Sequence, residues 1–240
     1  MLKRPMQSVT LSLYRFGPIH ARLWAFAQMG PARFSIARAP GIGFFKLCGS
    51  GTGEGFTPVP NTAVYAILAT WQSAEAAHHA LSQARIFRRY AAMSIESCTW
   101  HLSTATARGS WSGQSPFNAE AVTPQGPVAA LTRATIKPRI AMQFWRKVPA
   151  ISDVVGANTD VIFKIGVGEV PLLHQVTFSV WPSARAMDRF ARVSGPHARA
   201  IRAVREGRWF SEELYARFAI TDVTGSWEGR DMRAALAEAA

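Results

Sequence analysis

Histidine and cysteine are the side chains of this chain most able to bind a metal or to act as a nucleophile. The six histidines are His20, His78, His79, His101, His174 and His197. Gly195 and Pro196 place His197 in the first turn of a predicted helix, where proline is favoured. Ile201 and Val204 then share its helix face, and burial near a helix N-terminus favours the neutral imidazole that binds metals. His197 is therefore the first candidate ligand.

The remaining candidates are weaker. His78 and His79 are adjacent in a predicted helix, so one of them must face away from the core. His174 precedes a predicted strand. Cys48 could offer a thiolate, but a small buried residue also explains it and its repeat counterpart Gly166. An ordinary core or surface histidine is the alternative interpretation for each of the six.

The run from Gly49 to Gly55 is rich in glycine, yet no helical segment follows it. A dinucleotide or phosphate loop requires a helix N-terminus directly after the glycines. We therefore expect a flexible hairpin connection here. A mobile lip over a hydrophobic pocket is the alternative.

The elements that position these residues must belong to a globular chain. Its 240 residues are 48% hydrophobic and 18% charged, which predicts a sizeable core. Two cysteines exclude a disulfide scaffold and fit a reducing cytosol. The longest clean apolar run, Ala63–Trp71, is far shorter than the roughly 20 residues of a bilayer span, and the polar segment after Pro5 lacks a signal-peptide core. We expect a cytoplasmic protein.

The formal net charge of +12 is unusual. A basic surface can meet nucleic acid, anionic lipid or acidic proteins. The arginines are spread along the chain, so a general arginine bias is the alternative. A nucleic-acid binder would need aromatic side chains on an open sheet face. The predicted paired sheets would bury them, so we expect no nucleic-acid partner.

An internal repeat organises the chain. Leu13, Arg15, Phe26, Pro31, Phe45 and Lys46 recur as Leu131, Arg133, Phe144, Pro149, Phe163 and Lys164. Trp71, Ser73 and Ala76 recur as Trp181, Ser183 and Ala186, and Gly109-Ser110-Trp111 recurs as Gly225-Ser226-Trp227. Order, residue type and spacing all agree, so we interpret the two halves as copies of one unit.

Each half has the same predicted element order. The first half reads as strand Val9–Phe16, helix Arg22–Met29, strands Gly43–Leu47 and Ala63–Trp71, helix Ala74–Met93 and strand Thr99–Thr106. The second half reads as strand Ala129–Thr135, a helix near Ala141–Arg146, strands Asp160–Ile165 and Gln175–Val180, helices from Ser183, Pro196 and Ser211, and strand Phe218–Val223.

This order is that of the ferredoxin-like split βαβ motif. We therefore predict an α+β protein of two tandem ferredoxin-like repeats, residues 7–112 and 128–228, whose sheets pack face to face as a dimeric α/β-barrel-type sandwich. Residues 113–127, rich in Ser, Pro and Gly, form the predicted linker. Residues 229–240 form a C-terminal tail.

Long segments of the chain resemble the spheroidene monooxygenase family. They include FFKLCGSGTGEGFTPVPN, LTRATIKPRIAMQFW, DVIFKIGVGEVP and GPHARAIRAVREGRWFSEELYARF, and the resemblance covers roughly residues 9–227. It implies a haem-dependent monooxygenase that inserts oxygen from O₂ into an acyclic carotenoid, converting spheroidene to the 2-keto product. It also implies a ferredoxin-type electron donor and the dimeric α/β-barrel fold.

The resemblance gives the candidate residues their roles. His197 becomes the predicted axial ligand of the haem iron, and Lys164, Arg199 and Arg202 become predicted partners of the haem propionates, as does Arg133. The aromatic residues predicted to contact a long polyene are Phe144, Trp145, Phe163, Phe178 and Trp209. Each of these is also an ordinary core candidate.

Two alternatives accompany this prediction. One is a haem-binding or hydrophobic-ligand-binding protein without turnover, and the other is a related barrel oxygenase with another substrate. Because carotenoids reside in membranes and an acidic donor must dock, the basic surface also predicts peripheral contact with a membrane surface. The sequence leaves the oligomeric state open.

Overall fold

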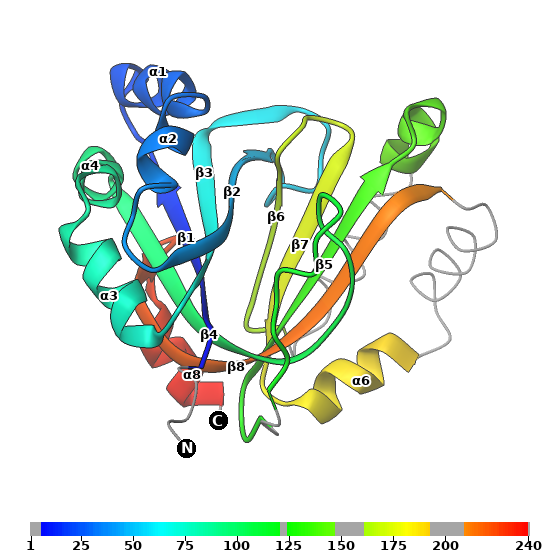
Figure 1. The fold of residues 1–240 in the computed structure, drawn as a ribbon. Helices are drawn as coiled ribbons and strands as arrows, with labels where there is room; N and C mark the ends of the chain where they lie inside the picture. Colours follow the sequence, from blue (N-terminus) through cyan, green and yellow to red (C-terminus); the bar gives the residue numbers. More distant parts are fainter. Residues whose placement is uncertain (1–5, 121–123, 147–160, 193–208, 240) are drawn as a thin grey trace.

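The structure is a computed structural model, and it describes residues 6–120, 124–146, 161–192 and 209–239 (Figure 1). The first half contains β1 (Ser8–Arg15), α1 (Ile19–Gln28), α2 (Ala32–Ile36), β2 (Ile42–Gly51), β3 (Pro60–Trp71), α3 (Ala74–Gln83), α4 (Arg85–Met93) and β4 (Glu96–Gly109). The second half contains β5 (Val128–Ile136), η1 (Pro138–Ile140), β6 (Phe163–Gly168), β7 (His174–Trp181), α6 (Ala184–Arg192), β8 (Phe210–Trp227), β9 (Arg230–Asp231) and α8 (Met232–Ala239).

Strands β1 to β8 close into an antiparallel barrel. The hydrogen-bonded order is β4-β1-β3-β2-β6-β7-β5-β8, and β8 pairs back with β4. The predicted barrel is confirmed. Its two half-sheets share one core and also join edge to edge, which the prediction of two sheets packed face to face did not include. The β2–β6 joint is short, with Gly49 opposite Gly168 and Ser50 opposite Val167. At the other side of the barrel, the long β4–β8 pairing removes an edge that would otherwise expose unpaired backbone groups.

The longer joint, between β4 and β8, has a symmetric register. Gly109 of β4 lies opposite Leu214, and Gly225 of β8 lies opposite Cys98. Both glycines have left-handed backbone angles, with φ of 92° and 88°. A Cβ on Gly225 would collide with the carbonyl oxygen of Ser97 across the joint, so only glycine fits there.

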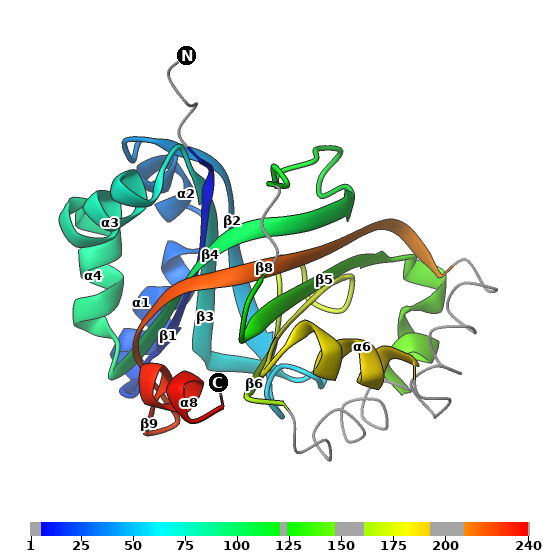
Figure 2. The ribbon, with the colours of Figure 1, turned by 90° about the horizontal axis from the view of Figure 1, so that it is seen from below.

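Apolar side chains fill the barrel. Those of β1, β3 and β4 that point inward, such as Leu11, Leu68 and Trp100, belong to one cluster with the inward side chains of the second half. A second cluster lies outside the barrel, where α1 to α4 cover the outer face of the first half-sheet with Tyr14 and Trp71 among its members (Figure 2). The outer face of the second half-sheet carries a far smaller cluster around Trp181 among the described residues.

Two predicted helices differ from the structure. The helix predicted over Ala74–Met93 is broken at Ala84, whose extended backbone (φ −69°, ψ 128°) separates α3 from α4. The helix predicted from Ser211 is wrong, because this segment is the first part of the 18-residue strand β8. The predicted helix at Pro196 lies outside the described residues.

The predicted repeat register also needs correction. Phe45 points out of the barrel into the cluster under the helices, whereas Phe163 points into the barrel. These two phenylalanines are therefore not equivalent, since a one-residue slip moves a strand residue to the other face. The cross-strand partners of Leu131 are Phe178 and Ala216, and those of Leu11 are Leu68 and Trp100. The counterpart of Leu131 in the first half is therefore Leu11, whereas the sequence comparison had assigned Leu13.

Candidate cofactor and substrate site

Two of the five predicted substrate-contacting aromatics lie in the barrel core. Phe163 of β6 and Phe178 of β7 contact the ring of Trp100 at centroid distances of 5.3 and 5.8 Å. All three side chains are buried. Packing of this kind stabilises the barrel through burial and edge-to-face contacts.

The other three aromatics lie outside this cluster. Phe144 packs against Phe210 at 5.8 Å between ring centroids. The indole N–H of Trp145 donates to the carbonyl oxygen of Leu172 at 2.8 Å. Trp209 is buried directly before β8. The five residues therefore do not form one wall.

A cavity of about 260 Å³ opens at the seam between the two halves, beside Phe163. Its apolar lining consists mainly of interior side chains, and charged side chains surround them. The charged residues are Arg15, Glu54, Lys164, Glu228 and Arg230. Sites that enclose a drug-sized ligand measure roughly 300–1,000 Å³. This cavity therefore cannot enclose a porphyrin or a whole polyene, although it can admit one end of a long chain.

Lys164 borders this cavity and already has partners. Its ammonium nitrogen lies 2.7 Å from the Glu54 carboxylate and 5.4 Å from the centre of the Phe56 ring. The Glu54 side chain is 45% exposed and that of Lys164 only 13%, so the ion pair is partly buried. His197, Arg199 and Arg202 lie outside the described residues.

A buried ionic cluster lies inside the barrel at the end where β5 and β6 finish. Arg133 points inward from β5, forms an ion pair with Glu212 of β8 and lies 4.0 Å from Glu169. Glu212 also accepts the backbone N–H groups of Ser112 and Gly113. Burial alone would raise the pKa of Glu212, but these N–H donors and Arg133 outweigh it and lower the pKa to about 2.

Glu169 completes the cluster. Its carboxylate accepts from Trp111 Nε1 at 2.6 Å and lies 2.8 Å from Lys46 Nζ. Burial opposes ionisation, yet these donors hold the pKa of Glu169 below its usual value. Arg133, predicted as a propionate partner, thus interacts with the carboxylates of Glu169 and Glu212. The cluster fixes the segment that follows β4 across the barrel end.

The outer faces of the two half-sheets differ sharply in side-chain volume. Each residue of a strand in the first half can be matched with a residue of the equivalent strand in the second half by comparing the residues that lie opposite them on neighbouring strands. Tyr14, Leu47, Tyr65 and Ile67 in the first half correspond to Ala134, Gly166, Gln175 and Thr177 in the second. The first set packs under helices. In the second set Ala134 and Thr177 have smaller side chains than their counterparts, whereas the place of a Cβ on Gly166 is filled by the Gly55 backbone and the Gln175 amide.

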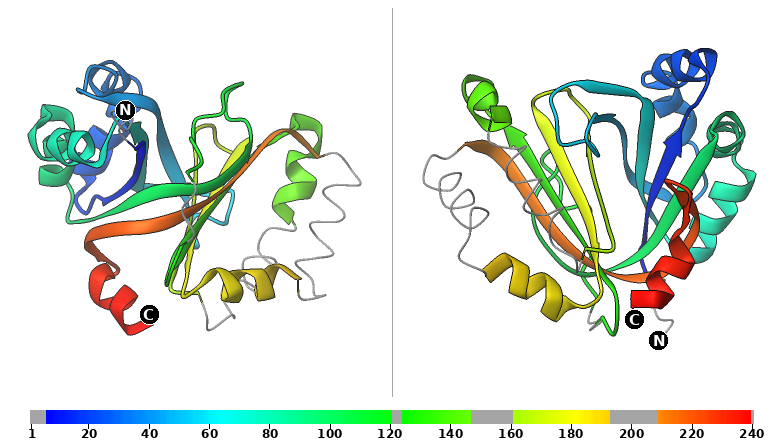
Figure 3. Two further views of the ribbon diagram at one scale, coloured as in Figure 1. Left: turned by 60° about the horizontal axis from the view of Figure 1, so that its bottom comes forward. Right: turned by 180° about the vertical axis from the view of Figure 1, so that it is seen from behind.

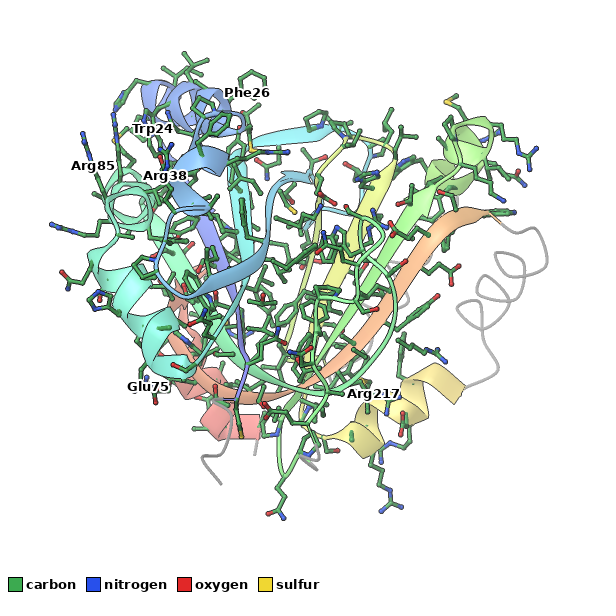
Figure 4. The ribbon with its side chains drawn as sticks, viewed as in Figure 1. Trp24, Phe26, Arg38, Glu75, Arg85 and Arg217 are labelled. Atoms are coloured by element: carbon green, nitrogen blue, oxygen red, sulfur yellow. The ribbon has the colours of Figure 1, made fainter. Side chains whose placement is uncertain are left out.

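The second outer face carries a buried amide, an exposed hydroxyl group and a cation. Gln175 Nε2 is buried and has no hydrogen-bond partner among the described residues. Thr132, in the middle of β5, is exposed. Arg217 of β8 reaches across toward α6, where it pairs with Asp188 at 2.7 Å (Figure 4). A flat apolar group with anionic edges would match this combination of small side chains, a free amide and a cation.

A separate group of possible metal ligands lies on the outer side of the β4–β8 joint. Nitrogen and oxygen atoms of His78, His101 and Asp222 lie within 4.8 Å of one another. The two imidazoles stack at 4.3 Å with an angle of 14° between their planes, so their lone pairs do not converge on one point. Asp222 is also held by Arg233 at 2.7 Å. Burial lowers the pKa of His101 to about 4, which keeps it neutral.

Cys48 points into the barrel and is buried. Burial raises the pKa of its thiol, with Glu169 adding to the effect. A thiol that stays protonated is a poor nucleophile and a poor metal ligand. The structure therefore supports the interpretation of Cys48 as a small core residue.

Comparison with known proteins identifies the relatives of this chain. It is 50% identical over 230 residues to spheroidene monooxygenase of Cereibacter sphaeroides, covering 94% of this chain and 70% of the relative. It is 47% identical to the Rhodobacter capsulatus protein of the same name, covering 95% of that protein, and 35% identical to that of Rubrivivax gelatinosus, covering 81%. The chain belongs to the spheroidene monooxygenase family. It is therefore a monooxygenase.

The fold of this chain is similar to that of solved structures. Two crystal structures of aldoxime dehydratases superpose with a TM-score of 0.63 at 9% and 10% identity, covering 92% and 96% of this chain. At such low identity the likeness concerns the fold alone. A scan against protein-family models found no match. In the described part of this spheroidene monooxygenase family member, no helix has the length and apolar character to cross a membrane.

Sequence reasoning missed the residues of the second outer face. Arg217 fell in a segment that was assigned to a helix, so its strand alternation was not used. Ala134, Gln175 and Thr177 have no chemistry that draws attention by residue type. The signal that could have found them is the comparison between halves, once the register of the repeat is correct.

Proposed function

We propose that this monooxygenase inserts oxygen into an acyclic carotenoid, converting spheroidene to its 2-keto product. The observation that carries the proposal is the 50% and 47% identity to two proteins named spheroidene monooxygenase. The apolar part of the lining of the seam cavity, which includes Val64, Phe163 and Trp227, supports it because a polyene is a hydrocarbon along most of its length.

We also propose that the cofactor is a haem seated on the outer face of the second half-sheet. Side chains cannot activate O₂ unaided, so a monooxygenase needs a redox group. A haem, when bound, would supply that O₂ activation. The small residues Ala134 and Thr177 fit a flat macrocycle, and the buried amide of Gln175 offers a donor that has no partner among the described residues.

The remaining roles follow from the sequence. His197 is the proposed axial ligand, and Arg199 and Arg202 are the proposed propionate partners. Lys164 and Arg217 are further cations bordering the same half, each held now by a partly exposed carboxylate. The chain's own residues would bind and orient the cofactor and exclude water, while the buried ionic cluster around Arg133 keeps its ion pairs.

The two halves are proposed to be tandem ferredoxin-like repeats. Strands β1 to β4 lie in the order β4-β1-β3-β2, and β5 to β8 lie in the matching order β8-β5-β7-β6. Ser73 and Ser183 cap the equivalent helices α3 and α6 by accepting the N–H of the third residue on. One half would then keep its packed outer layer while the other holds the cofactor.

Reduction of the cofactor is assigned to a ferredoxin-type donor. Such donors are acidic, and the +12 net charge of this chain would steer their approach. Raising the ionic strength should then slow reduction without changing the product.

The deciding experiment combines an absorption spectrum with product analysis. Purified protein should show a haem band that shifts on reduction and addition of CO, and with O₂ and a reductant it should convert spheroidene to an oxygenated product. His197→Ala should lose bound haem, with His79→Ala, on an exposed helix position, as its control. Full haem retention in His197→Ala would reject the ligand assignment.

The same experiment separates the alternatives. A haem spectrum without any oxygenated product would indicate a binding protein without turnover. Turnover of spheroidene without a haem spectrum would reject the cofactor. A haem spectrum with turnover of a different hydrophobic substrate would indicate a related oxygenase.

A further inference from the structure

Exposed apolar side chains are concentrated at one end of the molecule. The large hydrophobic residues exposed in the described part of the chain are Met6, Ile19, Leu23, Phe26, Phe34, Val59, Ile95, Met142, Val170 and Leu172. All except Met6 belong to segments at the upper end of the barrel in Figure 1: helices α1 and α2, the loops before β3 and β4, helical residues 141–146 and the β6–β7 turn. We call these nine residues the apolar rim.

Helix α1 shows that the rim is a specific feature. Ile19, Leu23 and Phe26 follow one another at i, i+4 and i+7, so they form one stripe along the helix. Their exposed fractions are 70%, 62% and 67%. The same helix packs on the barrel through Ala21 and Ala25, which are buried. Trp24 also packs inward, against Phe16 and Tyr90. The helix therefore has an inner face of Ala21, Trp24 and Ala25 and a second, exposed apolar stripe of Ile19, Leu23 and Phe26, which a surface helix in a soluble monomer rarely has.

The charges on α1, α2 and α4 and on the turn after α2 have one sign. Residues 1–53 contain no Asp or Glu. Arg33 and Arg38 are exposed on and beside α2, and Arg85, Arg88 and Arg89 are exposed on the adjacent α4. Figure 4 shows Arg38 and Arg85 on the helices next to Phe26. The exposed apolar side chains of α1 and α2, bordered by arginines and with no acid on α1, α2 or α4, are complementary to a negatively charged apolar boundary.

We infer that the apolar rim docks on the surface of a bilayer that contains anionic lipid. An acidic protein would satisfy the arginines, but it would have to desolvate four unpartnered side chains on α1 and α2 with a matching apolar patch. A second copy of the chain would bring arginine against arginine. Anionic lipid provides phosphates for the guanidinium groups and acyl chains for Phe26 and Phe34 in one surface.

The geometry has a consequence for substrate entry, which rests on the proposed function. In the views of Figure 3 the helical layers flank the strands, and the β2–β3 loop and the β6–β7 turn lie between them at the same end as α1. A substrate dissolved in the bilayer would then meet the protein at this end. The docking itself does not depend on the substrate.

Vesicle sedimentation tests the inference. The full chain is mixed with vesicles of phosphatidylcholine alone or with one third phosphatidylglycerol, at low and at physiological salt. We expect sedimentation with the anionic vesicles and much less with the neutral ones. Leu23→Ser/Phe26→Ser, at exposed positions that leave the core intact, should weaken the partition coefficient by about tenfold or more. Met6→Ser, exposed but outside the rim, should bind as the parent does.

Three results would overturn the inference. The first is no sedimentation of the parent chain with anionic vesicles. The second is equal binding by the parent and Leu23→Ser/Phe26→Ser. The third is self-association of the free chain, measured by analytical ultracentrifugation, that disappears in the double variant, because the rim would then be a contact between copies. Spheroidene turnover in detergent reports the proposed function separately, and it should be unchanged in the double variant.

Discussion

At the scale of single residues, the Glu212 carboxylate links the barrel interior to the segment after β4. Its pKa is lowered from 4.5 to about 2, because N–H donors and Arg133 outweigh the effect of burial. A carboxyl whose folded pKa is depressed contributes stability above its unfolded pKa and loses it as pH falls toward the folded value. We therefore expect the contribution of Glu212 to be complete at neutral pH and to disappear between about pH 4.5 and pH 2.

Glu212→Gln tests this expectation. At pH 7 the variant should lose roughly 2 kcal/mol of unfolding free energy, since hydrogen bonds to charged groups contribute about 1.5–3 kcal/mol each. The deficit should shrink as the parent protein is acidified. Urea unfolding at a series of pH values measures both quantities. Glu213→Gln, at the adjacent outward-facing position, is the control, and an equal, pH-independent loss in both variants would contradict the assignment.

At the scale of elements, the β4–β8 joint depends on two glycines that face each other's strand. Gly225→Ala combines a left-handed φ of 88° with a collision against the Ser97 carbonyl, so it should cost at least about 2 kcal/mol. Gly229→Ala has a comparable φ of 74° but open space around its Cβ, so it should cost only about 1 kcal/mol. Thermal or urea unfolding of both variants separates collision from backbone strain, and equal losses would show that the joint tolerates the methyl group.

The elements also show how far sequence patterns reach. The alternation in β1 and the buried run of β3 predicted strands that the structure contains, because period-two burial is a local signal. The segment from Ser211 was predicted as a helix, and Glu212, Glu213 and Leu214 do have moderate to high helix propensity. Pairing with β4 and β5 overrides that preference and produces one long strand. The edge-to-edge joining of the two half-sheets was hidden for the same reason, since it depends on contacts between β2 and β6 that lie far apart in the sequence.

The candidate site was predictable only in part. His197 was predicted from its residue type and helix position, and it stays a prediction because it lies outside the described residues. The sheet face proposed for the cofactor is marked by small side chains. Small residues such as Ala134 and Thr177 point to a possible site only when they are compared with Tyr14 and Ile67, their larger counterparts in the first half. A register error of one or two residues in the repeat was enough to hide that comparison.

At the scale of the whole molecule, one barrel supports two different outer layers. The first half-sheet is covered by four helices over aromatic and aliphatic side chains, and the second offers small ones. If the outer face of the second half-sheet binds the cofactor, larger side chains copied there from the first half-sheet should block binding. Ala134→Tyr/Thr177→Ile copies Tyr14 and Ile67 into their matched places.

We expect Ala134→Tyr/Thr177→Ile to fold with a melting temperature within a few degrees of the parent, because the changes point away from the barrel core and add apolar surface to a sheet face. Its haem content per chain after purification should fall by about tenfold, because overpacked sites reject a rigid ligand. Thr221→Ile, an exposed position of β8 beside the first half, should keep the parent's haem content. Absorbance at the haem band divided by protein concentration gives the comparison. An unchanged ratio in the double variant would place the cofactor on another face. A parent protein that contains no haem would reject haem as the cofactor.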